Sequence, residues 1–277
     1  MLDLNNLLFT LLIYIGSFSA GLLGSLTGLG GGVIVVPMLT VLFGVDIHFA
    51  AGASLISVIA TSSGAASAYV KEGFSNIRIG MFLEIATTIG AVVGASIVGL
   101  ISVNVVSIIF AVILFYSAVT TFIKKNMHVM HEPDPIAKKL KLNGNYPVGD
   151  TFVSYNVQKV PQGFITMIFA GVLSGLLGIG SGAAKVLAMD QIMKIPFKVS
   201  TTTSNFMIGV TAAASAGIYL KNGYIHAALV MPVLVGVLTG AFLGAKILRF
   251  TSSKNLKIIF SVILLVMAYE MLKNGLK

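Results

Sequence analysis

Lys185 is a basic residue inside an apolar stretch of the sequence, where charged side chains are unusual. It lies about one turn into a short apolar stretch, 183–193, away from the segment ends where a long side chain can reach water. If this stretch lies in a membrane, such a base is costly and is a candidate functional group by default. Lys185 could bind a substrate anion or take part in coupling, or it could form a structural ion pair with an acid such as Asp190. Asp190 lies five positions further on, off the helix face that residues four apart share, so we favour the functional role.

Two glycine clusters directly precede two short apolar stretches, 33–44 and 183–193. The first reads Gly-Leu-Gly-Gly-Gly from Gly28, and the second reads Gly-Ile-Gly-Ser-Gly from Gly178. A dinucleotide-binding fingerprint would need a preceding strand, whereas an apolar helix leads into both clusters. A helix that opens on such a run directs backbone N–H groups and the positive end of its dipole toward an anion, and close helix packing is the alternative. The candidate binding residues here are Gly30, Gly31, Gly32, Gly180, Ser181 and Gly182.

Polar side chains inside the apolar stretches add further candidates. Ser54, Ser204 and Asn205 could donate hydrogen bonds to an oxyanion without adding a fixed charge, or they could bond back to their own helices. Glu84 lies several residues inside the stretch 77–101, where a desolvated carboxyl group could carry a coupled proton. An ion pair between Glu84 and the nearby Arg78 is the alternative, and we favour it slightly. Asp190 is the second candidate for coupling.

The sequence contains few residues that could support other kinds of chemistry. The sequence has no cysteine and four histidines, so it offers no disulfide, no thiolate metal site and no cysteine nucleophile. The spacing of the nine acidic residues supplies no nucleophile–base arrangement, and we expect no enzyme, no metal and no cofactor. The formal charge of +9 does not call for nucleic acid, because the cytoplasmic loops of membrane proteins are rich in lysine and arginine.

The elements that must position these residues are membrane helices. The chain is 56% hydrophobic with a mean hydropathy of +0.98, and 10% of it is charged, against about 25% in an average soluble domain. The polar stretch 124–159 divides it, which predicts a first transmembrane part at 1–123, a cytoplasmic loop at 124–159 and a second transmembrane part at 160–277. The stretches long enough to cross a bilayer are 7–27, 47–70, 77–101, 103–123, 160–178, 198–220, 227–248 and 255–272.

The two halves repeat each other with a constant shift of 150 residues. Gly28 matches Gly178, Ser54 matches Ser204 and Thr61 matches Thr211. If the two short stretches also cross, each half has five crossings and the second half is inverted; if they dip in and return, each half has four and the halves are parallel. The inverted arrangement keeps most basic residues in the cytoplasm, whereas the parallel one places six more outside. We therefore predict an all-α polytopic membrane protein of two inverted repeats, each with about five helical segments and one short glycine-broken helix.

The repeat also predicts where the glycine clusters lie. Two breaks related by an inverted repeat should meet near the middle of the membrane and form one positively polarised pocket. The carrier interpretation depends on this pocket: it fails if the breaks lie apart, or if side chains seal them with no cavity between them. The small residues Gly90, Gly94, Gly240 and Gly244 recur at a spacing of four, which favours close helix packing over binding.

The glycine motif resembles that of a known family, the TauE/SafE sulfite exporters. The resemblance covers both halves and leaves out the central loop. It implies a secondary carrier for sulfur-containing anions such as sulfite, sulfonates or thiosulfate, coupled to an ion gradient. The second copy has Ser181 in place of Gly31 and Lys185 in place of Val35, which favours "small anion" over sulfite itself. The residues that carry the resemblance are Gly24, Gly28, Gly30, Gly31, Gly32, Pro37, Ala51-Gly52-Ala53-Ser54 and Glu72-Gly73 in the first copy, and Gly175, Gly178, Gly180 and Gly182 in the second.

Together these features predict an alternating-access exporter of small sulfur-containing anions in the cell membrane. Its partners would be the anion, a coupling ion with the proton as one candidate, and the lipid bilayer, but no nucleic acid; a homo-oligomer is left open. A passive anion channel and a membrane scaffold that transports nothing are the alternatives. Saturable flux and an effect of anions on thermal stability would separate the three.

Overall fold

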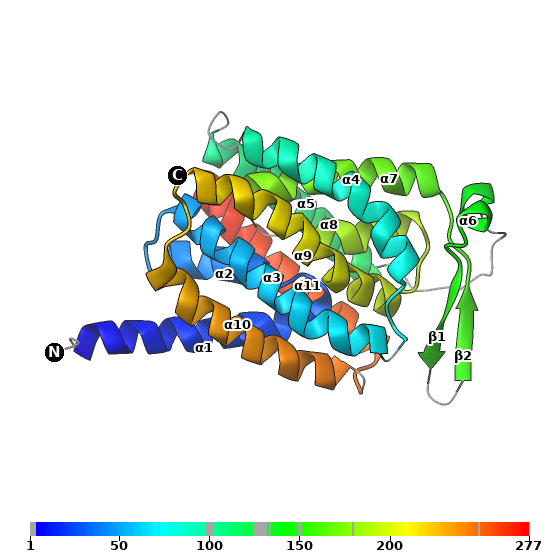
Figure 1. Cartoon of the computed structure of the whole chain (residues 1–277), viewed down its shortest axis with the longest axis horizontal. Helices are drawn as coiled ribbons and strands as arrows, with labels where there is room; N and C mark the ends of the chain where they lie inside the picture. The colour runs from blue at the N-terminus through cyan, green and yellow to red at the C-terminus, as the bar shows by residue number, and fades with distance from the viewer. Residues whose placement is uncertain are drawn as a thin grey trace.

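The computed structural model describes residues 4–71, 73–97, 102–123, 132, 134–148, 151–178, 180–248 and 250–276. Apart from one small hairpin, the described chain is a bundle of helices (Figure 1). The long helices are α1 (Leu4–Thr27), α3 (Ile47–Lys71), α4 (Ile77–Ser96), α5 (Val103–Ile123), α7 (Val160–Leu177), α9 (Phe197–Lys221), α10 (Ala227–Leu248) and α11 (Ser253–Gly275). The all-α prediction is confirmed, and each predicted long stretch overlaps one of these helices over most of its length.

The bundle has the composition of a multi-pass membrane protein. Among the described residues, five helices are long and apolar enough to cross a bilayer: Leu8–Thr27, Ile77–Ser96, Val160–Leu177, Ala227–Leu248 and Lys254–Lys273. Their outer faces carry large apolar side chains, such as Ile85, Phe169 and Met231, each more than half exposed. An apolar outer surface of this kind suits lipid tails and not water.

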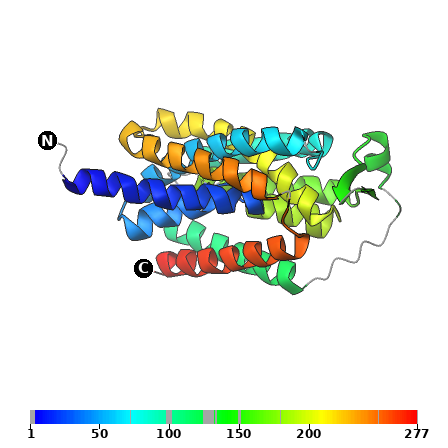
Figure 2. The same ribbon diagram turned by 90° about the horizontal axis from the view of Figure 1, so that it is seen from below.

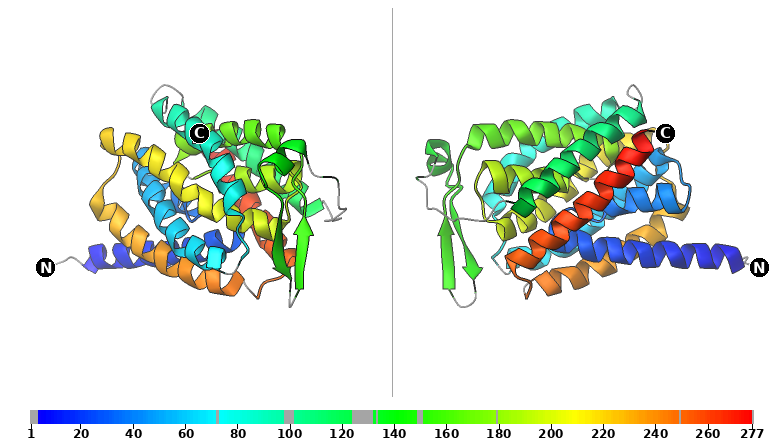
Figure 3. Two further views of the ribbon diagram at one scale, coloured as in Figure 1. Left: turned by 45° about the vertical axis from the view of Figure 1, so that its right-hand side comes forward. Right: turned by 180° about the vertical axis from the view of Figure 1, so that it is seen from behind.

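Each half of the chain supplies partners for the other. Helix α1 packs along α10 and α4 packs along α7, while α3 pairs with α9 and α5 pairs with α11. Figure 1 shows the first two pairs at opposite edges of the bundle, and Figure 3 shows α5 and α11 side by side at the back. Exchanging the two halves leaves this set of pairs unchanged, as expected for two related repeats. The inverted orientation of the repeats across a membrane stays a prediction.

Glycines hold two of these pairs close. A Cβ atom at Gly90 or Gly94 of α4 would overlap the backbone of α7 at Ile168 or Val172. A Cβ atom at Gly240 of α10 would likewise overlap the backbone of α1 at Phe18. Gly244 faces the same helix, against Leu22 and Ser25. The packing role predicted for these four glycines is confirmed.

The two predicted short segments form and turn back along the helix before them. The first consists of α2 (Gly32–Pro37) and the π-helical turn η1 (Met38–Leu42), and the second of α8 (Gly182–Leu187) and η2 (Ala188–Ile192). Along α1, the backbone N–H of Gly30 donates to the Gly24 carbonyl at 3.3 Å, and the rings of Phe9 and Phe43 lie 5.3 Å apart. The first segment thus returns toward the end at which α1 began, and Figure 2 shows α1 from a second side.

The region between the halves contains structure that the sequence analysis treats only as a polar loop. It holds the short helix α6 (Pro135–Lys139) and the antiparallel strands β1 (Gly144–Val148) and β2 (Thr151–Tyr155). The side-chain amide of Asn76, just before α4, donates to the Tyr155 hydroxyl at 2.8 Å and to the Leu142 carbonyl at 2.9 Å. Burial raises the pKa of Tyr155 to about 12, so this phenol keeps its proton at neutral pH. The hairpin therefore attaches to the start of α4, at the end of the bundle opposite the chain termini in Figure 1.

Candidate anion and coupling site

The two breaks after α1 and α7 need glycine for geometric reasons. Gly28 and Gly30 have φ of 76° and 71°, and their repeat partners Gly178 and Gly180 have 67° and 77°. These left-handed conformations cost a residue with a Cβ atom roughly 1–2 kcal/mol. Space is restricted as well, because a Cβ atom at Gly28 would lie 2.6 Å from the Thr201 carbonyl oxygen of α9. At these breaks a residue other than glycine would be strained by the left-handed backbone, and at Gly28 its Cβ atom would also collide with the opposite half.

The breaks of the two halves meet, as predicted. A Cβ atom at Gly182 would lie 2.5 Å from the carbonyl oxygens of Gly28 and Leu29, so the two backbones touch. The predicted pocket between them is filled, which corrects that expectation. The side chains of Val58 and Ile208, both fully buried, lie over Gly30 and Gly180. In this closed conformation apolar side chains therefore occupy the space between the breaks, which is the outcome that counts against a carrier. A carrier role then requires a second conformation in which the two halves part at this point.

Polar side chains surround the breaks, and some of their atoms lack partners. Ser204 Oγ donates to the Gly28 carbonyl at 2.8 Å, and Asn205 Nδ2 donates to the Ser25 carbonyl at 2.7 Å. Ser54 Oγ, Ser181 Oγ and Asn205 Oδ1 are buried and make no hydrogen bond within the described part of the chain. Buried polar atoms are usually hydrogen-bonded, and an exception calls for an explanation such as an absent ligand or water.

Lys185 lies in α8 beside the second break and is fully buried. Its Nζ atom donates to Glu84 Oε2 at 3.3 Å and to Thr211 Oγ1 at 2.5 Å. The Thr211 hydroxyl in turn contacts Glu84 Oε1, which also accepts from Thr88 Oγ1 at 3.2 Å. The acid comes from α4 of the first half, whereas Lys185 and Thr211 come from α8 and α9 of the second. A buried ion pair of this kind joins the two halves beside the point where the breaks meet.

Comparison with known proteins shows the family to which the chain belongs. Residues 13–271 match the family described as Sulfite exporter TauE/SafE. The chain belongs to this family.

Three similar proteins extend the comparison over most of the chain. The "Probable membrane transporter protein YunE" of Bacillus subtilis (strain 168) is 26% identical over 97% of this chain and 98% of its own. YdhB of the same organism, with the same description, is 30% identical over 85% and 89%. The "Probable membrane transporter protein MJ0441" of Methanocaldococcus jannaschii is 27% identical over 96% of each. No solved structure matches the chain.

Neither of the two ion pairs that the sequence offers as structural alternatives, Glu84 with Arg78 and Lys185 with Asp190, forms in the structure. Glu84 pairs with Lys185 and not with Arg78, whose guanidinium donates to the Lys141 carbonyl at 3.4 Å. Likewise Lys185 does not pair with Asp190, which accepts a hydrogen bond of 2.5 Å from the neighbouring Gln191. Both alternatives were chosen for nearness in sequence, whereas the actual pair spans 101 positions.

Sequence reasoning missed the part that Thr211 plays in this TauE/SafE site. Thr211 appeared in it only as the repeat partner of Thr61, yet its hydroxyl lies between Lys185 and Glu84. A signal was available in the spacing along α9. Ser204, Ile208 and Thr211 are four and then three positions apart, so they share one helix face, about 10 Å from end to end. This face connects the glycine breaks with the ion pair.

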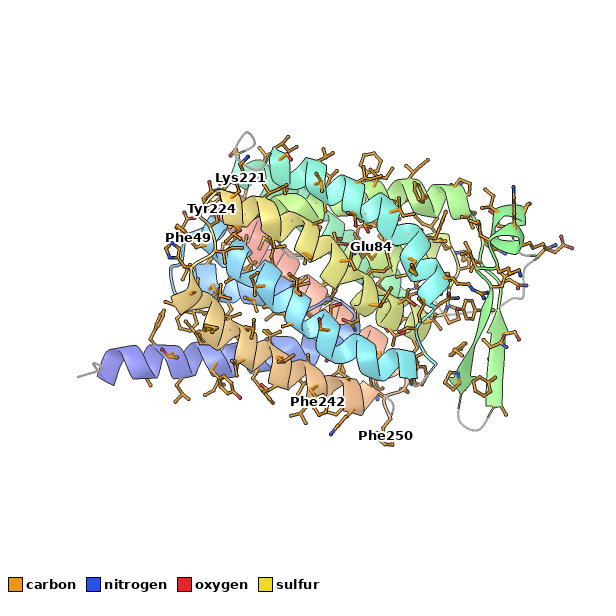
Figure 4. The ribbon with its side chains drawn as sticks, in the orientation of Figure 1. Phe49, Glu84, Lys221, Tyr224, Phe242 and Phe250 are labelled. Carbon is orange, nitrogen blue, oxygen red and sulfur yellow. The ribbon has the colours of Figure 1, made fainter. Side chains whose placement is uncertain are left out.

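The charged cluster spans both repeats and occurs at one of two repeat-related positions. Lys185 corresponds to Val35, Glu84 to Leu234 and Thr87, a neighbour of Thr211, to Val237. Thr61, which corresponds to Thr211, donates to the Ser57 carbonyl of its own helix at 2.8 Å. The acid and the base are therefore replaced by apolar residues at the repeat-related position, and the two halves of the chain are chemically unequal there. In Figure 4 Glu84 lies between the helix ends, away from Lys221 and Tyr224 at one end.

Proposed function

We propose that the protein is a secondary transporter of small sulfur-containing anions such as sulfite or sulfonates. It would work by alternating access and be driven by an ion gradient, with export as the direction that the family name suggests. The family match and the relatives described as membrane transporters support the transporter class. The anion is inferred from the family and from the charge of the site.

The observation that carries the proposal is the burial of Lys185 between the two halves. A fully buried ammonium group beside the glycine breaks gives the closed bundle a positive group near its centre. Its partner Glu84 comes from the other half, so a relative movement of the halves would change the surroundings of the charge. Nearby, Ser54 Oγ and Ser181 Oγ are buried hydroxyls without partners in the described structure, and they can donate to an anion.

The proposed location is the cell membrane, with the segment 124–159 in the cytoplasm. The exposed lysines Lys138, Lys139 and Lys141 lie in that segment, and cytoplasmic loops of membrane proteins are enriched in such residues. Lys221 lies at the opposite end of the helices from the hairpin (Figure 4), which places it outside in this arrangement. The inverted repeat and a homo-oligomer remain proposals of the same kind.

Thermal stability in detergent provides the first test. A ligand that binds only the folded protein raises its melting temperature, increasingly so as the concentration exceeds the dissociation constant. We expect at least one anion among sulfite, sulfate, thiosulfate, sulfoacetate, ethanesulfonate and simple carboxylates to do so. Lys185→Ala should abolish the shift, whereas Lys246→Ala, which alters an exposed lysine at the end of α10, should retain it. Normal anion affinity in a folded Lys185→Ala variant would refute the assigned role.

Flux in proteoliposomes then separates the proposal from its alternatives. A carrier should show saturable uptake that depends on an ion gradient, because each turnover needs a conformational change. Flux that rises in proportion to anion concentration would indicate a passive channel. If no anion alters stability or crosses the membrane, the transporter proposal itself is wrong and a scaffold role is favoured.

A further inference from the structure

We propose that Glu84 is the proton acceptor of this carrier and that a proton and an anion occupy the site together. The protein would then be a proton–anion symporter. This inference rests on the proposed function and adds to it the coupling ion, the residue that carries it and the sense of coupling. Three observations support it: the pairing of Glu84, the full burial of Lys185 and the apolar character of the repeat-related position.

The contacts of Glu84 suit the ionised carboxylate. Oε2 accepts from the Lys185 ammonium, while Oε1 accepts from Thr88 and contacts the Thr211 hydroxyl. Each of these groups can act as a donor, and an ionised carboxylate is an acceptor only. We therefore assign a negative charge to Glu84 and a positive charge to Lys185 in this conformation, and the two charges balance each other.

Charge balance in the site requires that a proton bind when an anion enters. A monoanion that approaches Lys185 would add a second negative charge next to Glu84 in a fully buried place. Like charges disfavour each other strongly where water is excluded. Protonation of Glu84 removes this conflict, because the carboxyl group becomes neutral and leaves Lys185 as the partner of the anion. A proton taken from water by Glu84 thus accompanies each anion that enters.

Among the described residues, Glu84 forms an ion pair with Lys185 and with no other ionisable side chain. Helix α4 packs on α7 and α9, and α8 packs on α9, α5, η2 and α7. The α7 sequence contains no ionisable residue. The remaining groups have other surroundings: Arg78 donates to the Lys141 carbonyl, Lys198 lies over the Phe74 ring, Tyr219 donates to the Gly175 and Leu176 carbonyls, Asp190 accepts from Gln191, and Lys221 and Tyr116 are exposed.

The unequal repeats set the number of coupled protons. Val35 and Leu234 stand where Lys185 and Glu84 would be repeated. One acid–base pair per chain gives one proton for each turnover, so the transport of a monoanion should be electroneutral. The direction of net transport then follows the combined gradients. An inward proton gradient drives uptake and opposes export. Export, the direction in the proposed function, then occurs when the outward gradient of the anion exceeds the inward proton gradient, and the anion gradient drives it.

The test uses the full-length protein in proteoliposomes, with thiosulfate and ethanesulfonate as probes. Neither anion takes up a proton near neutral pH, so any proton that moves with it must be carried by the protein. We expect uptake of a probe to acidify the lumen, as reported by an internal pH-sensitive dye, and an inward proton gradient to accelerate uptake. Uptake without proton movement, or with protons leaving the lumen, overturns the symport inference alone. Uptake of neither probe contradicts the proposed function and the inference together.

Glu84→Gln isolates the residue, because glutamine resembles the neutral acid in shape and cannot titrate. In the wild type, apparent affinity should fall as pH rises, by about tenfold for each pH unit once Glu84 has lost its proton. In Glu84→Gln the affinity should be independent of pH, and anion exchange should persist without proton movement. Wild-type pH dependence in this variant overturns the inference, as does loss of exchange while the wild-type melting temperature is retained. Thr61→Val, at the repeat-related position, should leave the pH dependence unchanged.

Discussion

Thr211 is the residue through which the acid and the base of the site are connected. Its hydroxyl accepts from Lys185 and contacts Glu84, so Thr211→Val removes a buried partner from both charged groups. Leaving a buried polar group unsatisfied costs about 1–3 kcal/mol, and more when the group is charged. We expect a loss of stability of that size, measured by chemical denaturation in detergent.

The repeat supplies a matched control for this substitution. Thr61 is equally buried, but its hydroxyl donates to the Ser57 carbonyl of its own helix. Such intrahelical back-bonding contributes little to stability, so Thr61→Val should cost clearly less stability than Thr211→Val. Equal effects of the two substitutions would contradict the bridging role of Thr211.

Sequence alone gave the charged residues of the site but not their pairing. A lysine and a glutamate inside apolar stretches are visible in the sequence, because burial of either charge is expensive. Their contact depends on the packing of α4 against α9 and on the return of α8 beside the second break. No local pattern contains this information, and nearness in sequence pointed to Arg78 and Asp190 instead. The anion-binding and coupling roles stay predictions.

At the scale of the elements, the glycine breaks differ from the other glycine turns in what surrounds them. Gly28 and Gly73 both have positive φ, at 76° and 75°. A Cβ atom at Gly28 would overlap Thr201, whereas a Cβ atom at Gly73 would have nothing within 4 Å. Gly73→Ala should therefore cost only the backbone strain of about 1–2 kcal/mol.

Gly28→Ala should cost more, because overpacking adds typically 1–3 kcal/mol to the same strain. The total expected is about 2–5 kcal/mol, and it should appear as a lower melting temperature in detergent. The pair of substitutions separates strain from contact with the opposite half. A Gly28→Ala variant as stable as Gly73→Ala would mean that the break does not press against α9.

The lengths of the apolar stretches and the 150-residue repeat were enough to locate the long helices and both short segments. Long apolar stretches report helices directly, because a membrane requires every backbone group to be satisfied within the segment. The hairpin of β1 and β2 was missed because residues distant in sequence stabilise it. Its stability comes from contacts with α4 through Asn76 and Tyr155, which the sequence of the loop does not display. The filled space between the breaks was missed because Val58 and Ile208 read as ordinary apolar helix residues.

For the whole molecule, alternating access requires the two halves to part where they now touch. Val58 of α3 and Ile208 of α9 are repeat partners, and both lie over Gly180. The chain has no native cysteine, so cysteines placed at these two positions would react without background. A short bis-methanethiosulfonate reagent forms a disulfide with each thiol and releases methanesulfinate, and by joining Val58→Cys to Ile208→Cys it should hold the closed conformation. We expect anion uptake to stop on cross-linking and to return on reduction, while either single-cysteine variant stays active after the same treatment. Full transport by the cross-linked protein would show that the two breaks need not separate, and the movement of the halves would have to occur elsewhere in the bundle.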